Sequence, residues 1–209
     1  MAVAKTAGSK THQVMSSRDR LRDAAKTLFA ECGFEATTTA AICRLAGTSQ
    51  SQLIKHFSDK QGMLEAIFEH AWEHINPAVR LATESITSPR DKIRVLIDMV
   101  LAFLEKDHAL RTLFLLEGRR IRGDGHMVVL VPGFLEFIKT VDGILKALEA
   151  QREFAPGLDR QAFRSALMGA IEGLLRDQML ARTSRFPASY TDADVRAVIV
   201  AFLSLCIRK

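Results

Sequence analysis

The stretch "TTTAAICRLAGTSQSQLIKHF", residues 37–57, determines how the N-terminal part of this chain folds. It predicts two short helices separated by a turn at Gly47, because glycine is typical of the residue that follows a helix. Thr37 or Thr38 can cap the first helix, and Ser49 can cap the second. A helix of about nine residues is not stable alone in water, so the two helices must share a core. The spacing turns these residues inward: Ala41, Ile42, Leu45, Leu53 and Phe57.

The second of these helices begins with a run of small, uncharged polar side chains. Two helices joined by such a turn form a helix-turn-helix, whose second helix enters the DNA major groove with its N-terminal side chains toward the bases. A glutamine can bond an adenine edge twice, and a serine can serve several bases. His56 and Lys60 are placed to contact phosphates, as are Thr38 and Thr39 at the start of the first helix. The expected base-facing residues are Ser49, Gln50, Ser51 and Gln52.

The composition of the 209-residue chain favours helices and a reducing compartment. The chain is 48% hydrophobic, and its 12 Gly, 5 Pro and one Tyr argue against a sheet-rich fold. It has no apolar run long enough for a transmembrane helix and no secretory signal, and its three cysteines without CxxC spacing suit the cytoplasm. Residues 1–60 carry nine Lys and Arg against five Asp and Glu, which is either ordinary scatter or the mark of an anionic partner.

Helical periodicity runs through the rest of the chain, with apolar residues recurring at i, i+3 and i+4. Pro77 lacks a backbone donor, so a kink or break is expected in the helix that begins near Asp59. Pro89 and Pro132 fit the first turns of later helices. The sequence thus predicts an all-α protein of about nine helices, the first three short. Its predicted divisions are a disordered basic arm at 1–15, a helix-turn-helix DNA-binding domain at 16–62, and an effector-binding and dimerisation domain at 63–209.

Residues 18–66, including "LFAECGFEATTTAAICRLAG" (28–47) and "LIKHFSDKQGML" (53–64), resemble the DNA-binding domain of tetracycline-repressor (TetR) family transcriptional regulators. The resemblance implies a larger helical body that binds an effector and a homodimer formed by the last two helices. It also implies DNA contacts at positions matching Thr38, Thr39, Gln50, Ser51, Gln52, His56 and Lys60. Ala40 and Ala41 are small where the family often has longer polar residues, which favours a contact from Arg44 instead. Ser49, Ile54 and Lys55 complete the candidate DNA-binding residues. The chain departs from the family at Ile54, where an aromatic residue, most often Tyr, usually contacts the DNA backbone. Ile54 removes that polar contact and is able to meet a thymine methyl instead.

The predicted body supplies candidates for an effector cavity and for a dimer interface. Large apolar side chains are mostly core, but some line cavities, and a carboxylate in an apolar stretch is either exposed, paired or part of a polar pocket. Asp98, Glu117 and Glu172 are such carboxylates. The candidate effector residues are Phe68, Trp72, Met99, Phe103, Phe114, Glu117, Phe134, Phe137, Met168 and Glu172. The last two helices are apolar over more than one stripe, and the candidate dimer residues there are Phe163, Leu167, Ala170, Ile171, Leu174, Val195, Val198, Phe202 and Leu205.

The favoured interpretation is a cytoplasmic, homodimeric regulator, most simply a repressor, that binds a palindromic operator and is released by a small-molecule effector. No cofactor or enzymatic activity is expected, since phosphate-loop, GxSxG and dinucleotide-binding motifs are missing from the sequence. The alternative is a helical enzyme or metal-binding protein that uses His70 and His74, spaced i, i+4, or the buried carboxylates. Cys32 and Cys43 lie on neighbouring predicted helices, where they are either a thiol pair or two small buried residues.

Overall fold

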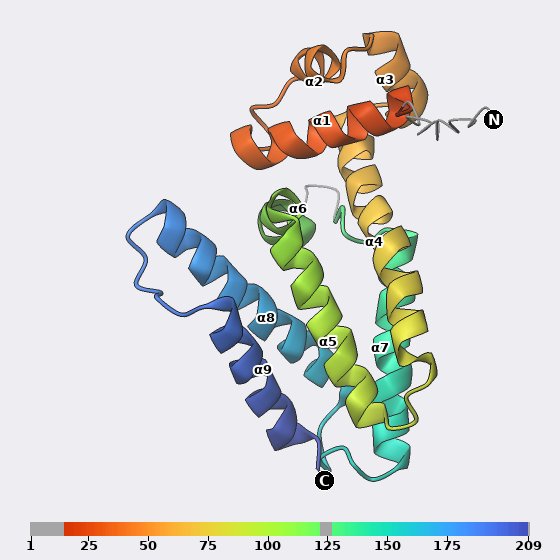
Figure 1. Ribbon diagram of the computed structural model, residues 1–209, viewed down its shortest axis with the longest axis vertical. Helices are drawn as coiled ribbons and strands as arrows, with labels where there is room; N and C mark the ends of the chain where they lie inside the picture. The colour runs from red at the N-terminus through yellow and green to blue at the C-terminus, as the bar shows by residue number, and fades with distance from the viewer. Residues whose placement is uncertain (1–14, 122–126, 209) are drawn as a thin grey trace, which may run out of the picture.

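The computed structural model describes residues 15–121 and 127–208 of the chain. Figure 1 shows a small helical unit at one end, a larger body at the other, and one long helix running between them. Within the described residues the only strand-like feature is one isolated bridge between Phe154 and Ile207, so the predicted all-α fold is confirmed. The elements are α1 (Ser17–Cys32), α2 (Thr39–Ala46), α3 (Gln50–Phe57), α4 (Lys60–Glu84), α5 (Pro89–Lys106), α6 (His108–Leu113), the π-helical turn η1 (Phe114–Gly118), α7 (Pro132–Ala150), α8 (Arg160–Thr183) and α9 (Asp192–Cys206).

The first three helices form the small unit, and local sequence signals place their ends. The Ser16, Thr38 and Ser49 side chains each accept a hydrogen bond from a backbone N–H in the first turn that follows, so all three cap a helix. Gly47 ends α2 in the left-handed conformation, with φ 58° and ψ 45°, which favours glycine. The buried centre of the unit consists of Leu21, Ala25, Phe29, Ile42, Leu53 and Phe57.

Leu45 does not join this core, although its spacing predicts that it should. Its side chain is 56% exposed, and Cys43 and Ala46 turn inward with Ile42 instead. In a helix of eight residues, both the i+3 and the i+4 neighbour of Ile42 fit an inward face. Only the position of α1 decides between them.

A kink or a break was predicted at Pro77; α4 continues through Pro77 to Glu84, so there is no break. Proline removes the hydrogen bond to the carbonyl four residues earlier. Ile75 and Val79, on either side of Pro77, are buried in the core of the body, and this packing holds both halves of the helix in place. The apolar residues 128–131 form no strand; Val128 and Val129 lie in a turn and are packed in the core.

α7 begins in close contact with α4. The backbone N–H of Gly133 donates to Glu69 Oε2 at 2.9 Å, and Asn76 Nδ2 donates to the Gly133 carbonyl at 2.9 Å. A Cβ at Gly133 would lie 2.5 Å from Trp72 Cβ, so a glycine is required for this approach. The contact fixes the middle of α4 to the body.

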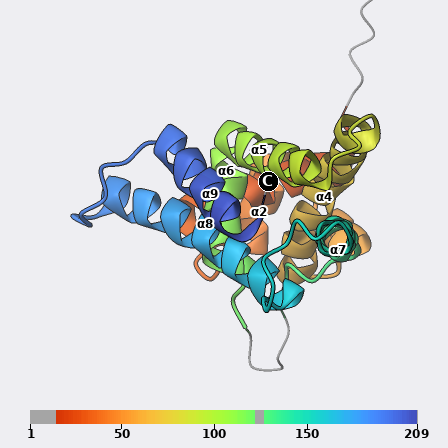
Figure 2. The same cartoon turned by 90° about the horizontal axis from the view of Figure 1, so that it is seen from below.

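The body is built from α4, α5 and α7 packed together, with α8 and α9 beside them. Viewed from below, α8 and α9 lie on the opposite side of the body from α4 and α7 (Figure 2). The small unit meets the body through α4 and through the contact of α1 with α6. Among the described helices, none combines the length and apolar character needed to cross a membrane.

Candidate functional site

α3 lies in the helical unit at the end of the molecule farthest from the C-terminus (Figure 1). Gln50 and Ser51 in its first turn are exposed. Leu53 and Phe57 are 0% and 6% exposed, and they anchor the inner face of the helix. The predicted DNA-contacting residues lie on α3 and its cap, on α2 and its cap, and at the start of α4. Those that are exposed are Thr38, Arg44, Ser49, Gln50, Ser51, Ile54 and Lys55, and those that are partly exposed are Thr39, Gln52, His56 and Lys60.

The side-chain amide of Gln50, the first residue of α3, is held by two residues of α2. Gln50 Nε2 donates to Thr39 Oγ1 at 3.1 Å, and the Cys43 thiol lies 3.5 Å from Gln50 Oε1 as a donor. Cys43 is 7% exposed. Sequence analysis placed Thr39 and Gln50 in the site but gave no reason to include Cys43.

Two further side chains of α3 are held from α1. The Ser17 hydroxyl lies 2.9 Å from His56 Nε2 and 3.5 Å from Gln52 Oε1. Since Ser16 caps α1, the neighbouring Ser17 hydroxyl is free for these contacts. The exposed polar face of α3 is therefore ordered by both helices that pack against it.

Lys60 is not placed to contact a phosphate, and this corrects the sequence prediction. Its ammonium donates to the carbonyls of Phe34 at 2.7 Å, Glu35 at 3.2 Å and Thr37 at 3.2 Å. It also lies 4.4 Å from the centroid of the Phe34 ring. An ammonium has three donors, and all three are used within the chain. Lys60 instead stabilises the loop between α1 and α2.

A cavity of about 580 Å³, counted with its opening, lies inside the body. Five of the ten predicted effector residues line it: Trp72, Phe114, Phe137, Met168 and Glu172. Phe68 and Phe103 line a smaller space beside it. Trp72 and Phe114 line both this space and the main cavity. Met99, Glu117 and Phe134 line neither. Phe134 packs on Trp72 with ring centroids 5.4 Å apart, and Glu117 lies buried in η1, 3.6 Å from Arg120.

The rest of the cavity wall consists mainly of aliphatic side chains that were not predicted to bind an effector, and two of them, Leu167 and Ile171, were predicted at the dimer interface instead. These residues are Ile93, Leu96, Ile97, Val100, Leu104, Val141, Leu167 and Ile171. Nothing in the sequence distinguishes an aliphatic residue facing a cavity from one packed against a neighbour. Arg164 also lines the cavity and pairs with Asp142. Its charge beside the apolar stripe of α8 is the feature of the sequence that could have indicated a cavity residue here.

The carboxylate of Glu172 is the acidic group of this cavity. Its side chain is 13% exposed, and Oε1 lies 2.9 Å from Nε of Arg119, just after η1. Burial raises the pKa of Glu172, while the charges of Arg119 and Arg176 oppose that shift. This ion pair joins one wall of the cavity to η1, and η1 continues directly from α6.

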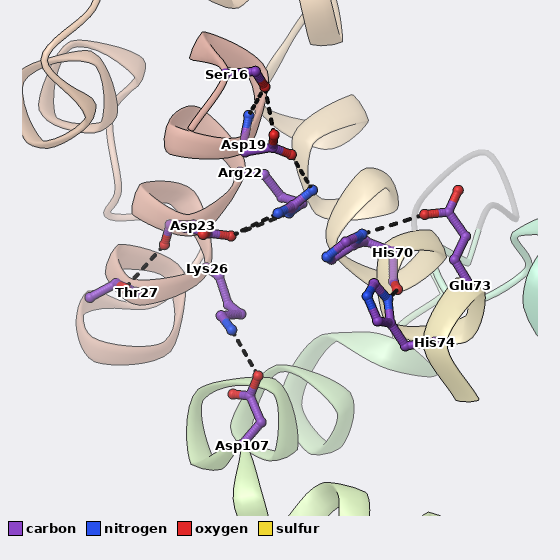
Figure 3. A network of polar contacts seen from close by, with 10 residues as sticks. All are labelled: Ser16, Asp19, Arg22, Asp23, Lys26, Thr27, His70, Glu73, His74 and Asp107. Carbon is purple, nitrogen blue, oxygen red and sulfur yellow. Dashed lines mark hydrogen bonds and ion pairs between the residues drawn. The ribbon is translucent and has the colours of Figure 1, made fainter. Parts of the chain in front are cut away.

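A network of polar contacts joins the small unit to the body (Figure 3). Arg22 of α1 pairs with Asp19 at 2.8 Å and with Asp23 at 3.2 Å. Lys26, one turn further along α1, pairs with Asp107 at 2.7 Å, and Asp107 also caps α6 by accepting from the Leu110 N–H. Lys26 and Asp107 therefore form a direct ionic contact between the two parts of the molecule.

His70 and His74 lie beside this network with ring centroids 4.4 Å apart. His74 Nδ1 is 2.8 Å from the His70 carbonyl, and His70 Nδ1 is 3.4 Å from Glu73. Burial, Arg22 and His74 together lower the pKa of His70. In the described ranges, no three His, Cys, Asp or Glu side chains are grouped as metal ligands. Asp98, another candidate acid, is exposed and pairs with Arg196 at 3.2 Å.

The outer surface of α8 and α9 differs from the predicted dimer interface in three residues. Phe163, Leu167 and Val195 are 5%, 3% and 1% exposed, so they belong to the core of the chain itself. The wide apolar pattern of α8 and α9 covers two surfaces, one that faces the core and one that faces outward. These three side chains belong to the inward surface. Val198 and Leu205 are 51% and 80% exposed, and Ala170, Ile171, Leu174 and Phe202 are partly exposed.

Cys32 and Cys43 also differ from their prediction as two buried residues. Cys32 is exposed and Cys43 is buried, and both are free thiols.

Comparisons with known proteins converge on one family. Residues 21–67 match the family described as "Bacterial regulatory proteins, tetR family". The HTH-type transcriptional repressor KstR2 of Mycolicibacterium smegmatis is 29% identical over 109 residues, which cover 52% of this chain and 53% of KstR2. The HTH-type transcriptional regulator BetI of Serratia proteamaculans is 32% identical over 82 residues, 38% of this chain and 41% of BetI. The aligned region thus spans about half of these relatives or less.

One solved structure shows that the fold is shared beyond this region. The regulator FadR from Bacillus subtilis, in complex with stearoyl-CoA, superposes with a TM-score of 0.75 over 91% of this chain and 99% of FadR. Its sequence identity of 20% supports a common fold alone.

Proposed function

Because the chain belongs to the tetR family of bacterial regulatory proteins through its N-terminal domain, we propose that it is an effector-responsive transcriptional repressor. It binds a palindromic DNA operator as a homodimer, with α3 of each protomer in the major groove. Two recognition helices read successive grooves when they lie about 34–36 Å apart. The observation that carries this proposal is the polar, exposed first turn of α3, anchored by Leu53 and Phe57.

A selection from random duplex DNA, followed by sequencing, tests the proposal. The protein is expected to enrich a palindrome, and Gln50→Ala and Gln52→Ala are expected to weaken binding to it by about tenfold or more each. Binding to unrelated DNA changes little, since that binding rests on phosphates. Fluorescence anisotropy with the selected duplex and a scrambled one measures the two affinities. If no sequence is enriched by the wild-type protein, the proposal fails.

The effector is a mostly apolar molecule that enters the cavity bounded by Trp72, Phe114 and Phe137. This follows from the aliphatic and aromatic walls, with Glu172 and Arg164 as the polar groups. Stearoyl-CoA, the ligand named for FadR, is a suitable first probe because it has a long apolar chain. An effector releases DNA only by the difference in its affinity for the two states of the protein.

The effector is tested by adding stearoyl-CoA and shorter acyl-CoA molecules to the protein–DNA complex. An acting ligand lowers the anisotropy of labelled operator DNA. Ile171→Trp, which fills part of the cavity, should abolish this response. Because Ile171 is also a candidate dimer residue, sedimentation and operator binding of this variant without ligand are measured beside it. Leu135→Trp, at an exposed position on α7 outside the cavity, serves as the control. A response that survives Ile171→Trp unchanged places the ligand elsewhere.

A further inference from the structure

The amide of Gln50 is held in one orientation by its partners on α2. Thr39 Oγ1 accepts from Gln50 Nε2, and the Cys43 thiol donates to Gln50 Oε1. A thiol is a weak donor and a weaker acceptor, so the atom facing Cys43 is the oxygen. Burial raises the pKa of Cys43, which keeps the thiol protonated and able to donate. The contact with Cys43 therefore sets which end of the amide is oxygen, and the Thr39 hydroxyl, which can donate or accept, accepts from the nitrogen end.

These contacts leave half of the amide's hydrogen-bonding capacity unused. A glutamine side chain has two N–H donors and two oxygen lone pairs, and Thr39 and Cys43 each use one. The remaining donor and lone pair match the N7 acceptor and N6 donor of adenine in the major groove. An amide that is already oriented also loses less conformational entropy when it binds a base.

We propose that Cys43 and Thr39 are positioning residues that fix the amide of Gln50 so that it selects adenine at one position of each operator half-site. The proposal rests on the DNA-binding function proposed above. Cys43 is buried beneath Gln50 and acts on DNA only through it, so its effect is confined to the base that Gln50 contacts.

The test compares base preferences selected from a random duplex library by wild-type protein and by variants. Wild type is expected to prefer adenine at one position, and Gln50→Ala removes that preference. Cys43→Ala reduces it by about threefold, the loss expected for one weak hydrogen bond, while the other positions are unchanged. Cys43→Ser, which retains a donor, preserves the preference. Thr39→Val also reduces it, and Thr39→Ser restores it.

A double variant separates a positioning role from a merely structural one. Cys43→Ala combined with Gln50→Ala should give the same base preferences as Gln50→Ala alone, because no amide is left to position. The proposal is overturned if Cys43→Ala has the wild-type profile, or if it weakens all positions equally. An enriched palindrome without an adenine preference at the Gln50 position also overturns it. The DNA-binding function itself is contradicted by a different result, namely that the wild-type protein enriches no sequence at all.

Discussion

At the scale of single residues, the lysines predicted to contact DNA have two different roles: one is available to bind DNA, and the other stabilises the fold. Lys55 is exposed on the outer face of α3, whereas Lys60 is held by three backbone carbonyls of the loop between α1 and α2. Both were assigned to DNA from the sequence, because the sequence does not show where the carbonyls of a distant loop lie. Only the exposed lysine has donors available for a phosphate.

The two lysines are therefore expected to respond differently to substitution. Lys60→Ala should lower the free energy of unfolding by about 1–3 kcal/mol, since it leaves partly buried carbonyls without their donor. Lys55→Ala should leave stability within about 0.5 kcal/mol and reduce the salt dependence of DNA binding by about one counterion. Urea unfolding and anisotropy titrations at several salt concentrations measure the two effects. Equal stability of both variants contradicts the assignment of Lys60.

Ser16 and Ser17 form a second matched pair of adjacent residues. Ser16→Ala removes the cap of α1 and should cost about 1 kcal/mol of stability, with DNA specificity unchanged. Ser17→Ala removes the contact to His56 and Gln52 and should weaken operator binding about threefold to tenfold, with stability nearly unchanged. Thermal unfolding and operator binding of both proteins check this. The prediction fails if Ser17→Ala binds the operator as tightly as wild type.

At the scale of helices, local signals gave the ends of elements but not the contacts between them. Ser49 and Pro89 begin their helices as predicted, because a cap and a first-turn proline act within a few residues of the chain. Leu45 was predicted to face inward but is exposed, and no break occurs at Pro77, since both outcomes depend on how α1 and the body pack against these residues. Nine of the fourteen residues that line the cavity were not predicted as effector residues, for the same reason.

The contact of α1 with the start of α6 gives a prediction about pH. Burial alone would raise the pKa of Asp107, but its bonds to Lys26 and to the Leu110 N–H outweigh burial and hold the pKa below its usual value. A carboxyl group with a lowered pKa stabilises the folded state above its unfolded pKa of about 3.9, and this stabilisation is lost as pH falls through the folded pKa.

Lys26→Met removes the ion pair and keeps Asp107 as the cap of α6. It should lower the free energy of unfolding by at most about 1 kcal/mol at pH 7, because the pair is partly exposed. The difference from wild type should shrink as pH falls below about 4. Urea unfolding between pH 7 and pH 3 measures it. A difference that grows on acidification contradicts the assigned role of the pair.

At the scale of the whole molecule, the fold class and the helix-turn-helix followed from periodicity and from one short stretch of sequence. The dimer surface was predicted less well, because a helix that is apolar all round does not show which side faces its own core. The structure separates the two sides: Phe163, Leu167 and Val195 are internal, whereas Val198 and Leu205 face outward. The proposed homodimer therefore rests on the outward residues.

Leu205→Glu tests that assembly, since a charge in an apolar interface opposes association. The variant is expected to be a monomer by analytical ultracentrifugation at micromolar concentration and to bind a single half-site weakly. Leu81→Glu is the matched control, because Leu81 is 74% exposed on α4, outside the α8–α9 surface. It should sediment as wild type does. A dimer that persists in the Leu205 variant excludes this residue from the interface.

The close approach of Gly133 to Trp72 limits where the molecule can bend. Since the start of α7 contacts α4 from Glu69 to Asn76, that part of α4 moves with the body, and the arm of α4 that can tilt with the small N-terminal unit is the segment between Lys60 and Glu69. Such a tilt also shifts the contact of α1 with α6, including the Lys26–Asp107 ion pair. At 1.5 Å per residue this arm is about 14 Å long. A tilt of about 10° at Glu69 displaces its tip by roughly 2 Å, which is the size of helix shift that separates states in many allosteric proteins. In a symmetric dimer both arms tilt, so the change in spacing between the two recognition helices is doubled.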